Sequence, residues 1–162
     1  YIRQMKNINF ILFAASLFVL SACSSDNDTI KDEEKPTITI DYDGGFPQVC
    51  ESLQRGETYT FRARLADNEA LASYSLDLHH NFDHHTHDDQ GATCSLDAKK
   101  ESVNPFIYME NFSLDGARKE FEIEIKILIP TAIDTGDYHC SFSVTDEVGW
   151  QSRTSVDIKI VD

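Results

Sequence analysis

The chain has 162 residues, of which 28 are acidic and 14 are basic, so its formal net charge at pH 7 is −14. This excess of negative charge excludes the phosphate backbone of nucleic acids as a partner. It favours cations in general, although acidity alone defines no specific site. Once the N-terminal segment is set aside, the length suits one domain with a substantial core and is too short for two.

The N-terminal segment 1–22 has the pattern of a secretory signal peptide. Met5 and Lys6 form a short basic start, and the apolar run over 10–20 is too short to span a bilayer. The residues Tyr1–Gln4 are interpreted as an extension ahead of the true start at Met5.

The signal segment ends in Leu-Ser-Ala-Cys at Cys23, which resembles the lipobox of bacterial lipoproteins. This resemblance implies cleavage before Cys23 and attachment of lipid to its sulfur. We therefore expect a protein of the Gram-negative cell envelope, held by lipid at the outer membrane. Segment 23–35 is expected to be an acidic, disordered tether. Its start at 24–28 is either an ordinary spacer or similar to the acidic signals that send some lipoproteins to the cell surface.

Residues 36–162 are predicted to form an all-β domain, because polar and apolar residues alternate with a period of two and no long helical pattern occurs. Polar turns are expected at Asp67–Glu69, where calcium binding is the weaker alternative, and at Asp115–Gly116. About seven short strands at this spacing predict an antiparallel, immunoglobulin-like β-sandwich. The expected strands are 37–42, 58–65, 72–80, 119–129, 138–145 and 152–161, with one or two short edge strands near 103–106.

Two stretches of the domain are distinctive: DLHHNFDHHTH at 77–87 and GDYH at 136–139. They resemble a family of bacterial lipoproteins of unknown function with an immunoglobulin-like fold. The resemblance extends over most of 36–161 and implies the fold and a location outside the cytoplasm. It carries no activity over to this chain.

The cysteines that remain after lipidation of Cys23 are odd in number, which in an oxidising compartment leaves one unpaired. The strand expected at 58–65 offers Cys140 no partner, so Cys140 is predicted to be a small core residue. Cys50 and Cys94 fall at the same pole of the expected sandwich. We predict a disulfide between them, and thiolate ligation of a metal by one of the two is the alternative.

Five of the six histidines lie within 79–87. This density indicates a metal site, and the alternative is a polar surface loop that binds no metal. If Leu78 and Cys140 point into the core, the period of two places His79 and His139 on the opposite face of neighbouring strands. Two histidines distant in sequence would then meet beside the loop, which favours the metal site. The predicted ligands are His79, Asp83, His85, His87 and His139, with Asp83 either a ligand or an orienting group.

The other polar side chains of this stretch are not predicted to be main metal ligands. His80 is expected to point inward as a core or rim histidine, and Asp88 and Asp89 are expected to face solvent. His84 is expected to contribute much less to metal binding than the predicted ligands. Three or four imidazoles suit zinc best, and copper or nickel are alternatives, whereas calcium prefers oxygen ligands.

The sequence therefore predicts a lipid-anchored protein that captures or transfers zinc, with an outer-membrane transporter or another envelope protein as candidate partner. The main alternative is a non-catalytic adhesion or accessory module in which the metal is structural. No catalytic residues are predicted.

One enzyme class is similar in part. His85-Thr86-His87, Cys94 and Asn104-Pro105 are similar to elements of copper–zinc superoxide dismutases. Val103 stands where those enzymes have a bridging histidine, and the later glycine-rich loop is missing from the sequence. Enzyme activity is accordingly not expected.

Overall fold

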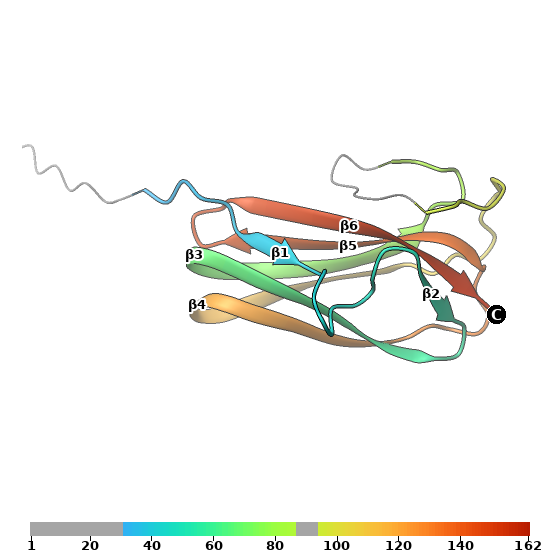
Figure 1. Cartoon of the computed structure of the whole chain (residues 1–162), viewed down its shortest axis with the longest axis horizontal. Coiled ribbons are helices and arrows are strands. Elements are labelled where there is room, and N and C mark those ends of the chain that lie inside the picture. The colour runs from blue at the N-terminus through green and yellow to red at the C-terminus, as the bar shows by residue number, and fades with distance from the viewer. Residues whose placement is uncertain (1–30, 87–93) are drawn as a thin grey trace, which may run out of the picture. The chain divides into compact units, whose positions relative to one another are not determined.

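The computed structural model describes residues 31–86 and 94–162, and its compact unit runs from Asp32 to Asp162. The strands of this unit form one hydrogen-bonded sheet in the order β1-β3-β5-β6-β2, with β4 paired to β3 (Figure 1). Among the described residues, no helix has the length and apolar character needed to cross a membrane. The strands are β1 (Thr37–Thr39), β2 (Glu51–Gln54), β3 (Thr58–His80), β4 (Tyr108–Leu128), β5 (Gly136–Asp146) and β6 (Gln151–Val161).

Strand β3 combines two expected strands and the turn expected between them. Its pairing with β4 shifts register between Ala66 and Leu71 instead of ending there. The Asp67 carboxylate accepts hydrogen bonds from the backbone N–H groups of Glu69 and Ala70, both at 2.8 Å. The polar segment therefore bends the strand as a bulge does, without ending it.

Strand β4 bends at the same level of the sheet. It begins at Tyr108, well before the expected start at Lys119, and continues through the expected turn. Gly116 and Ala117 adopt positive φ angles of 88° and 46°, which redirect the chain while pairing with β3 resumes on either side.

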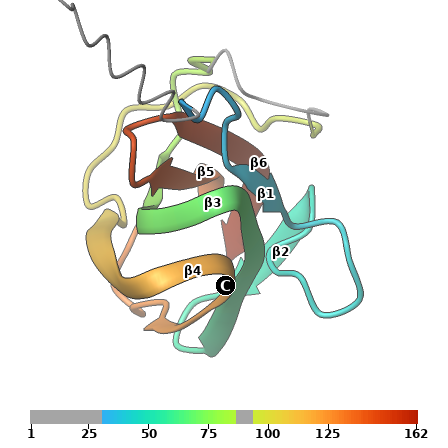
Figure 2. The same ribbon diagram turned by 90° about the vertical axis from the view of Figure 1, so that its left-hand side faces the viewer.

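These two bends curl the sheet so that its halves face each other (Figure 2). The first half of β3 pairs with β1 and the second half of β4, whereas its second half pairs with β5 and the first half of β4. The predicted all-β sandwich is confirmed, with six strands among the described residues in place of about seven. Each large core side chain contributes about 1.5–3 kcal/mol through burial. The core side chains that are at most 1% exposed include Phe61, Leu65, Leu76, Leu78, Ile123, Tyr138, Phe142, Ile158 and Ile160.

Strand β2 was not expected from the sequence. It pairs in parallel with β6, so that Glu51 lies opposite Ile158, and the sheet is therefore not wholly antiparallel. Leu53 is its only buried side chain, so its sequence carries no alternation from which a strand could be predicted.

The cysteines are arranged as predicted. Cys50 and Cys94 form a disulfide, and Cys140 is a free, buried thiol. Burial raises the pKa of Cys140 well above its usual value, so the thiol stays protonated and serves as a core residue. Because both other sulfurs are in the disulfide, the alternative of thiolate ligation is wrong for this structure.

Candidate metal centre

His79 on β3 and His139 on β5 lie directly opposite each other across the two strands. Their sequence neighbours Leu78 and Cys140 are wholly buried in the core, so the histidines occupy the other face of the sheet, as predicted. Their ring centroids are 5.5 Å apart. His139 is itself 0% exposed, so this face is covered at the site and not open to solvent.

His85 returns to the sheet from the segment that follows β3. The backbone N–H of Asn81 donates to the carbonyl of Asp137, and His84 N–H donates to the carbonyl of Asn81, which closes a tight turn. His84 has a φ of 59°, and this left-handed conformation turns the chain back over the strands.

The turn completes a cluster of three imidazoles. The ring of His85 stacks on His79 with a centroid distance of 5.3 Å and meets His139 at 5.0 Å. The Nε2 atoms of His79 and His85 are 3.2 Å apart, and Nε2 of His139 lies 3.3 Å from the carbonyl oxygen of His85. Strands and loop thus bring together three of the five predicted ligands.

Each of the three imidazoles has a carboxylate beside its Nδ1 atom. The distances are 2.9 Å from His79 to Asp77 and 2.6 Å from His85 to Asp83. The corresponding distance from His139 to Asp157 is 2.8 Å, and Asp157 is only 3% exposed. At His79 and His85 the carboxylate keeps the proton on Nδ1 and leaves the Nε2 lone pair available to a metal ion. Nε2 of His139 faces the carbonyl oxygen of His85 and is placed as a donor, so this ring binds a metal only once its proton lies on Nδ1, beside Asp157.

Asp83 contacts Nδ1 of His85, which is the arrangement that its predicted orienting role requires. The hydrogen bond from His85 lowers the pKa of the Asp83 carboxyl to about 2. The carboxylate is therefore ionised under all ordinary conditions and favours the His85 tautomer that carries its proton on Nδ1.

Sequence reasoning missed Asp77 and Asp157. Asp77 precedes His79 by two residues, so the period of two already placed both on one face of a strand. Asp157 lies opposite His139 in the pairing of β5 with β6, a position that only the register reveals. The first carboxylate could have been found from the sequence pattern, and the second could not.

The remaining histidines lie apart from the three-histidine cluster or beyond the described residues. Nε2 of His84 is 2.9 Å from the carbonyl oxygen of Asp97, away from the cluster. His80 is half-buried, and its ring stacks on Phe82 with a centroid distance of 4.8 Å, in keeping with a rim histidine. The predicted ligand His87 lies outside the described residues, as do Asp88 and Asp89.

Both cysteines of the disulfide contact Asp157 on β6. The backbone N–H of Cys50 donates to the carbonyl of Asp157 at 2.8 Å, and the N–H of Cys94 donates to its carboxylate at 3.4 Å. Lys159 adds ion pairs to Asp97 at 2.6 Å and to Asp137 at 3.1 Å. The Asp157 carboxylate is thus held in place next to His139.

The fold and this cluster define a β-sandwich domain with a histidine-rich pole. The chain belongs to the family described as Domain of unknown function (DUF4625), whose model matches residues 21–161. Among solved structures, the chain is similar to Spo0M, a sporulation control protein from Bacillus subtilis, at 8% sequence identity and a TM-score of 0.39. That similarity covers 79% of this chain and 49% of the other, so the chain spans about half the length of that protein. No curated protein sequence matches the chain.

Proposed function

We propose that this protein binds one transition-metal ion, zinc above copper or nickel, and captures it or passes it on at the bacterial cell envelope. The proposed ligands are Nε2 of His79, His85 and His139, with His87 as the fourth. Asp83 acts as an orienting group, together with Asp77 and Asp157.

The observation that carries the proposal is the approach of two Nε2 atoms, from His79 and His85, to 3.2 Å. Both rings have a carboxylate at Nδ1, which favours the proton there and leaves a lone pair on each Nε2. Two facing lone pairs repel unless a cation lies between them. A proton or a metal ion would serve, and a third imidazole beside them, with its ring centroid 5.0–5.5 Å from the other two, favours the metal.

The distances also suit zinc. Two nitrogen ligands at 2.0–2.1 Å from a tetrahedral zinc ion lie about 3.3 Å from each other. The separation of 3.2 Å between His79 and His85 is close to this value. Neutral imidazoles with carboxylates on the second nitrogen are a common zinc environment, which copper and nickel share in part.

The solvent exposure of His79 and His85 favours capture or transfer of the ion over a purely structural role. The side chains of His79 and His85 are 23% and 34% exposed, so an ion at their Nε2 atoms could exchange with solvent or with a partner. Structural zinc sites are usually closed. The second candidate is a non-catalytic adhesion or accessory module, favoured by the fact that an ion here would join the segment carrying His85 to the two strands.

The location is proposed from the sequence. Cys23 at the end of a lipobox would carry the lipid, and segment 24–31 would connect it to the compact unit that begins at Asp32. A metal site held close to the outer membrane would suit delivery to a transporter or another envelope protein.

The decisive test compares His139→Ala with His84→Ala in zinc titrations of the metal-free protein. His139 lies in the cluster although it is distant in sequence, whereas His84 belongs to the histidine-rich stretch and faces Asp97. We expect the wild type and His84→Ala to bind about one zinc ion alike, and His139→Ala to bind at least about 100-fold more weakly, as expected for loss of a ligand. Binding should also weaken at acid pH, because protons compete for the imidazole nitrogens.

Thermal unfolding in the presence of chelator serves as the control for folding of both variants. If His139→Ala folds and titrates as the wild type does, zinc is bound by the histidine-rich segment alone and the proposed site is wrong. Rapid zinc transfer to a competing chelator would support capture or transfer, and transfer only upon unfolding would support the structural alternative.

A further inference from the structure

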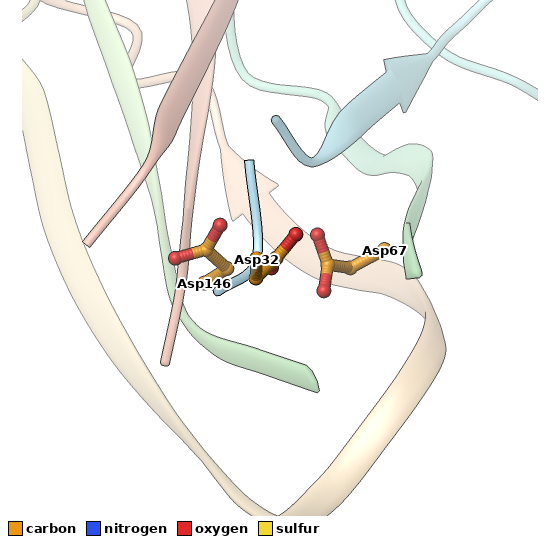
Figure 3. Close-up of side chains that lie close together, drawn as sticks. All are labelled: Asp32, Asp67 and Asp146. Atoms are coloured by element: carbon orange, nitrogen blue, oxygen red, sulfur yellow. The ribbon is translucent and has the colours of Figure 1, made fainter. Parts of the chain in front are cut away.

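A second cluster of charged side chains lies far along β5 from the histidines. Asp32 precedes β1, Asp67 lies in the bend of β3, and Asp146 ends β5 (Figure 3). One carboxylate oxygen from each lies within 4.8 Å of the other two. Asp32 is 7% exposed and Asp146 is 2% exposed, so two of the three carboxylates are almost wholly buried.

One oxygen of each carboxylate, Oδ1, accepts hydrogen bonds from neighbouring N–H groups. Oδ1 of Asp146 accepts hydrogen bonds from three successive backbone N–H groups, those of Val148, Gly149 and Trp150, at 2.7–3.0 Å. Oδ1 of Asp67 accepts two backbone N–H groups in the same way. These bonds fix the orientation of both carboxylates.

Asp32 lies in a different part of the chain, and its Oδ1 atom is also fixed by two hydrogen bonds. Its Oδ1 atom accepts from the side-chain amide of Asn68 at 2.9 Å and from the N–H of Glu34 at 3.1 Å. Trp150 also donates its indole N–H to the backbone carbonyl of Asp32 at 3.1 Å. The residue is thus attached to the bend of β3 and to the hairpin between β5 and β6, which carry the other two carboxylates.

The second oxygen of each carboxylate has no hydrogen-bond partner. Oδ2 of Asp32, Asp67 and Asp146 is buried in every case. No lysine or arginine in 31–86 or 94–162 lies within ion-pair distance of any of them. Three neighbouring carboxylates, two of them almost wholly buried and each with one buried oxygen that accepts no hydrogen bond, are unfavourable unless a cation compensates them.

We propose that Asp32, Asp67 and Asp146 bind one calcium ion. The donors are all carboxylate oxygens, which calcium prefers, whereas zinc and copper prefer nitrogen and sulfur. Calcium–oxygen distances of 2.3–2.6 Å allow two ligand oxygens to lie up to about 5 Å apart, and the three aspartates meet that limit. Magnesium requires a smaller, near-octahedral site and gives up its waters reluctantly.

The ion would join the segment before β1 to the bend of β3 and to the hairpin between β5 and β6. It would thereby order the point at which the chain enters the domain. His139 lies near the start of β5 and Asp146 at its end, so the two sites share a strand but no ligand.

The test uses the full chain, stripped with EGTA and titrated with calcium alone. We expect one calcium ion to bind and the melting temperature to rise by about 5–10 °C at a saturating concentration. Asp146→Asn should abolish both effects. Because this substitution also removes a buried charge, the variant should melt in EGTA at or above the temperature of the wild type.

Two controls separate this site from other causes. Asp43→Asn changes an exposed aspartate outside the cluster and should leave the calcium response intact. His139→Ala should also keep it, so that failure of zinc binding and failure of calcium binding are distinguishable. The proposal is overturned if the wild type shows no calcium response, if Asp146→Asn retains it, or if magnesium has an equal effect.

Discussion

At the scale of single residues, the histidine cluster depends on which nitrogen of each ring carries the proton. The three carboxylates at Nδ1 come from a position two residues before His79, a position two residues before His85, and a neighbouring strand in the case of Asp157. The carboxylates beside His79 and His85 leave their Nε2 atoms facing each other, and Asp157 lies beside Nδ1 of His139, where it can hold the proton when Nε2 binds a metal.

Asp157→Asn tests this positioning role. The amide no longer holds the Nδ1 proton of His139 as strongly, so the imidazole becomes a poorer donor to the metal. We expect zinc affinity to fall about 10–100-fold, as is typical when such a partner is replaced. Isothermal titration with zinc measures the change, and Asp115→Asn, an exposed aspartate in the bend of β4, is the matched control.

A loss of stability in chelator without any loss of zinc affinity would assign Asp157 a purely structural role. The residue is buried and accepts an N–H from Cys94, so some loss of stability is expected in either case. Zinc affinity is therefore the measurement that decides.

At the scale of elements, the bend of β3 and the Cys50–Cys94 disulfide help to position the side chains of the two proposed sites. The bend of β3 presents Asp67, and the segment after its end presents His85. The disulfide joins the segment before β2 to the segment that follows the histidine stretch, across a sequence separation of 44 residues. The bend of β3 and the disulfide therefore act on side chains that the two proposed sites use.

The double variant Cys50→Ser/Cys94→Ser should lower the free energy of unfolding by about 2–4 kcal/mol, because the disulfide restricts the unfolded chain. Zinc binding should also weaken, since Cys50 and Cys94 both contact Asp157. Denaturant unfolding measures the first effect. The wild type treated with dithiothreitol should match the variant, and the pairing is unimportant if reduction leaves its stability unchanged.

At the scale of the whole molecule, the proposed lipid on Cys23 would keep both sites close to a membrane. The net charge of −14 would draw cations toward the domain without selecting among them. Selection would fall to the two sets of ligands, one rich in nitrogen and the other made of oxygen.

Cys23→Ser tests the anchor. We expect the variant to leave the membrane fraction and to lose the mass of the lipid, because its only acceptor sulfur is gone. Cell fractionation and intact-mass measurement report both effects, and Ser24→Ala is the control. Unchanged fractionation together with an unchanged mass would contradict the lipoprotein interpretation.

The sequence alone determined the parts of this structure that depend on local periodicity. Alternation with a period of two predicts the β-fold and places His79 and His139 on one face, and the structure confirms both. The poles of the expected sandwich predict the Cys50–Cys94 disulfide. Each of these inferences needs only the orientation of a side chain along its own strand and the neighbour relation of two strands.

Tertiary structure alone decided what depends on register and on how the sheet curls. Polar segments at Asp67 and Gly116 look like ends of strands, yet pairing on both sides carries the strands through them as bends. Asp157 meets His139 only through the register of β5 with β6. The sequence places Asp32 in the disordered tether, whereas the structure buries it beside Asp67 and Asp146 at the start of the compact unit. The contacts that bury Asp32 come from residues distant in sequence, such as Asn68 and Trp150.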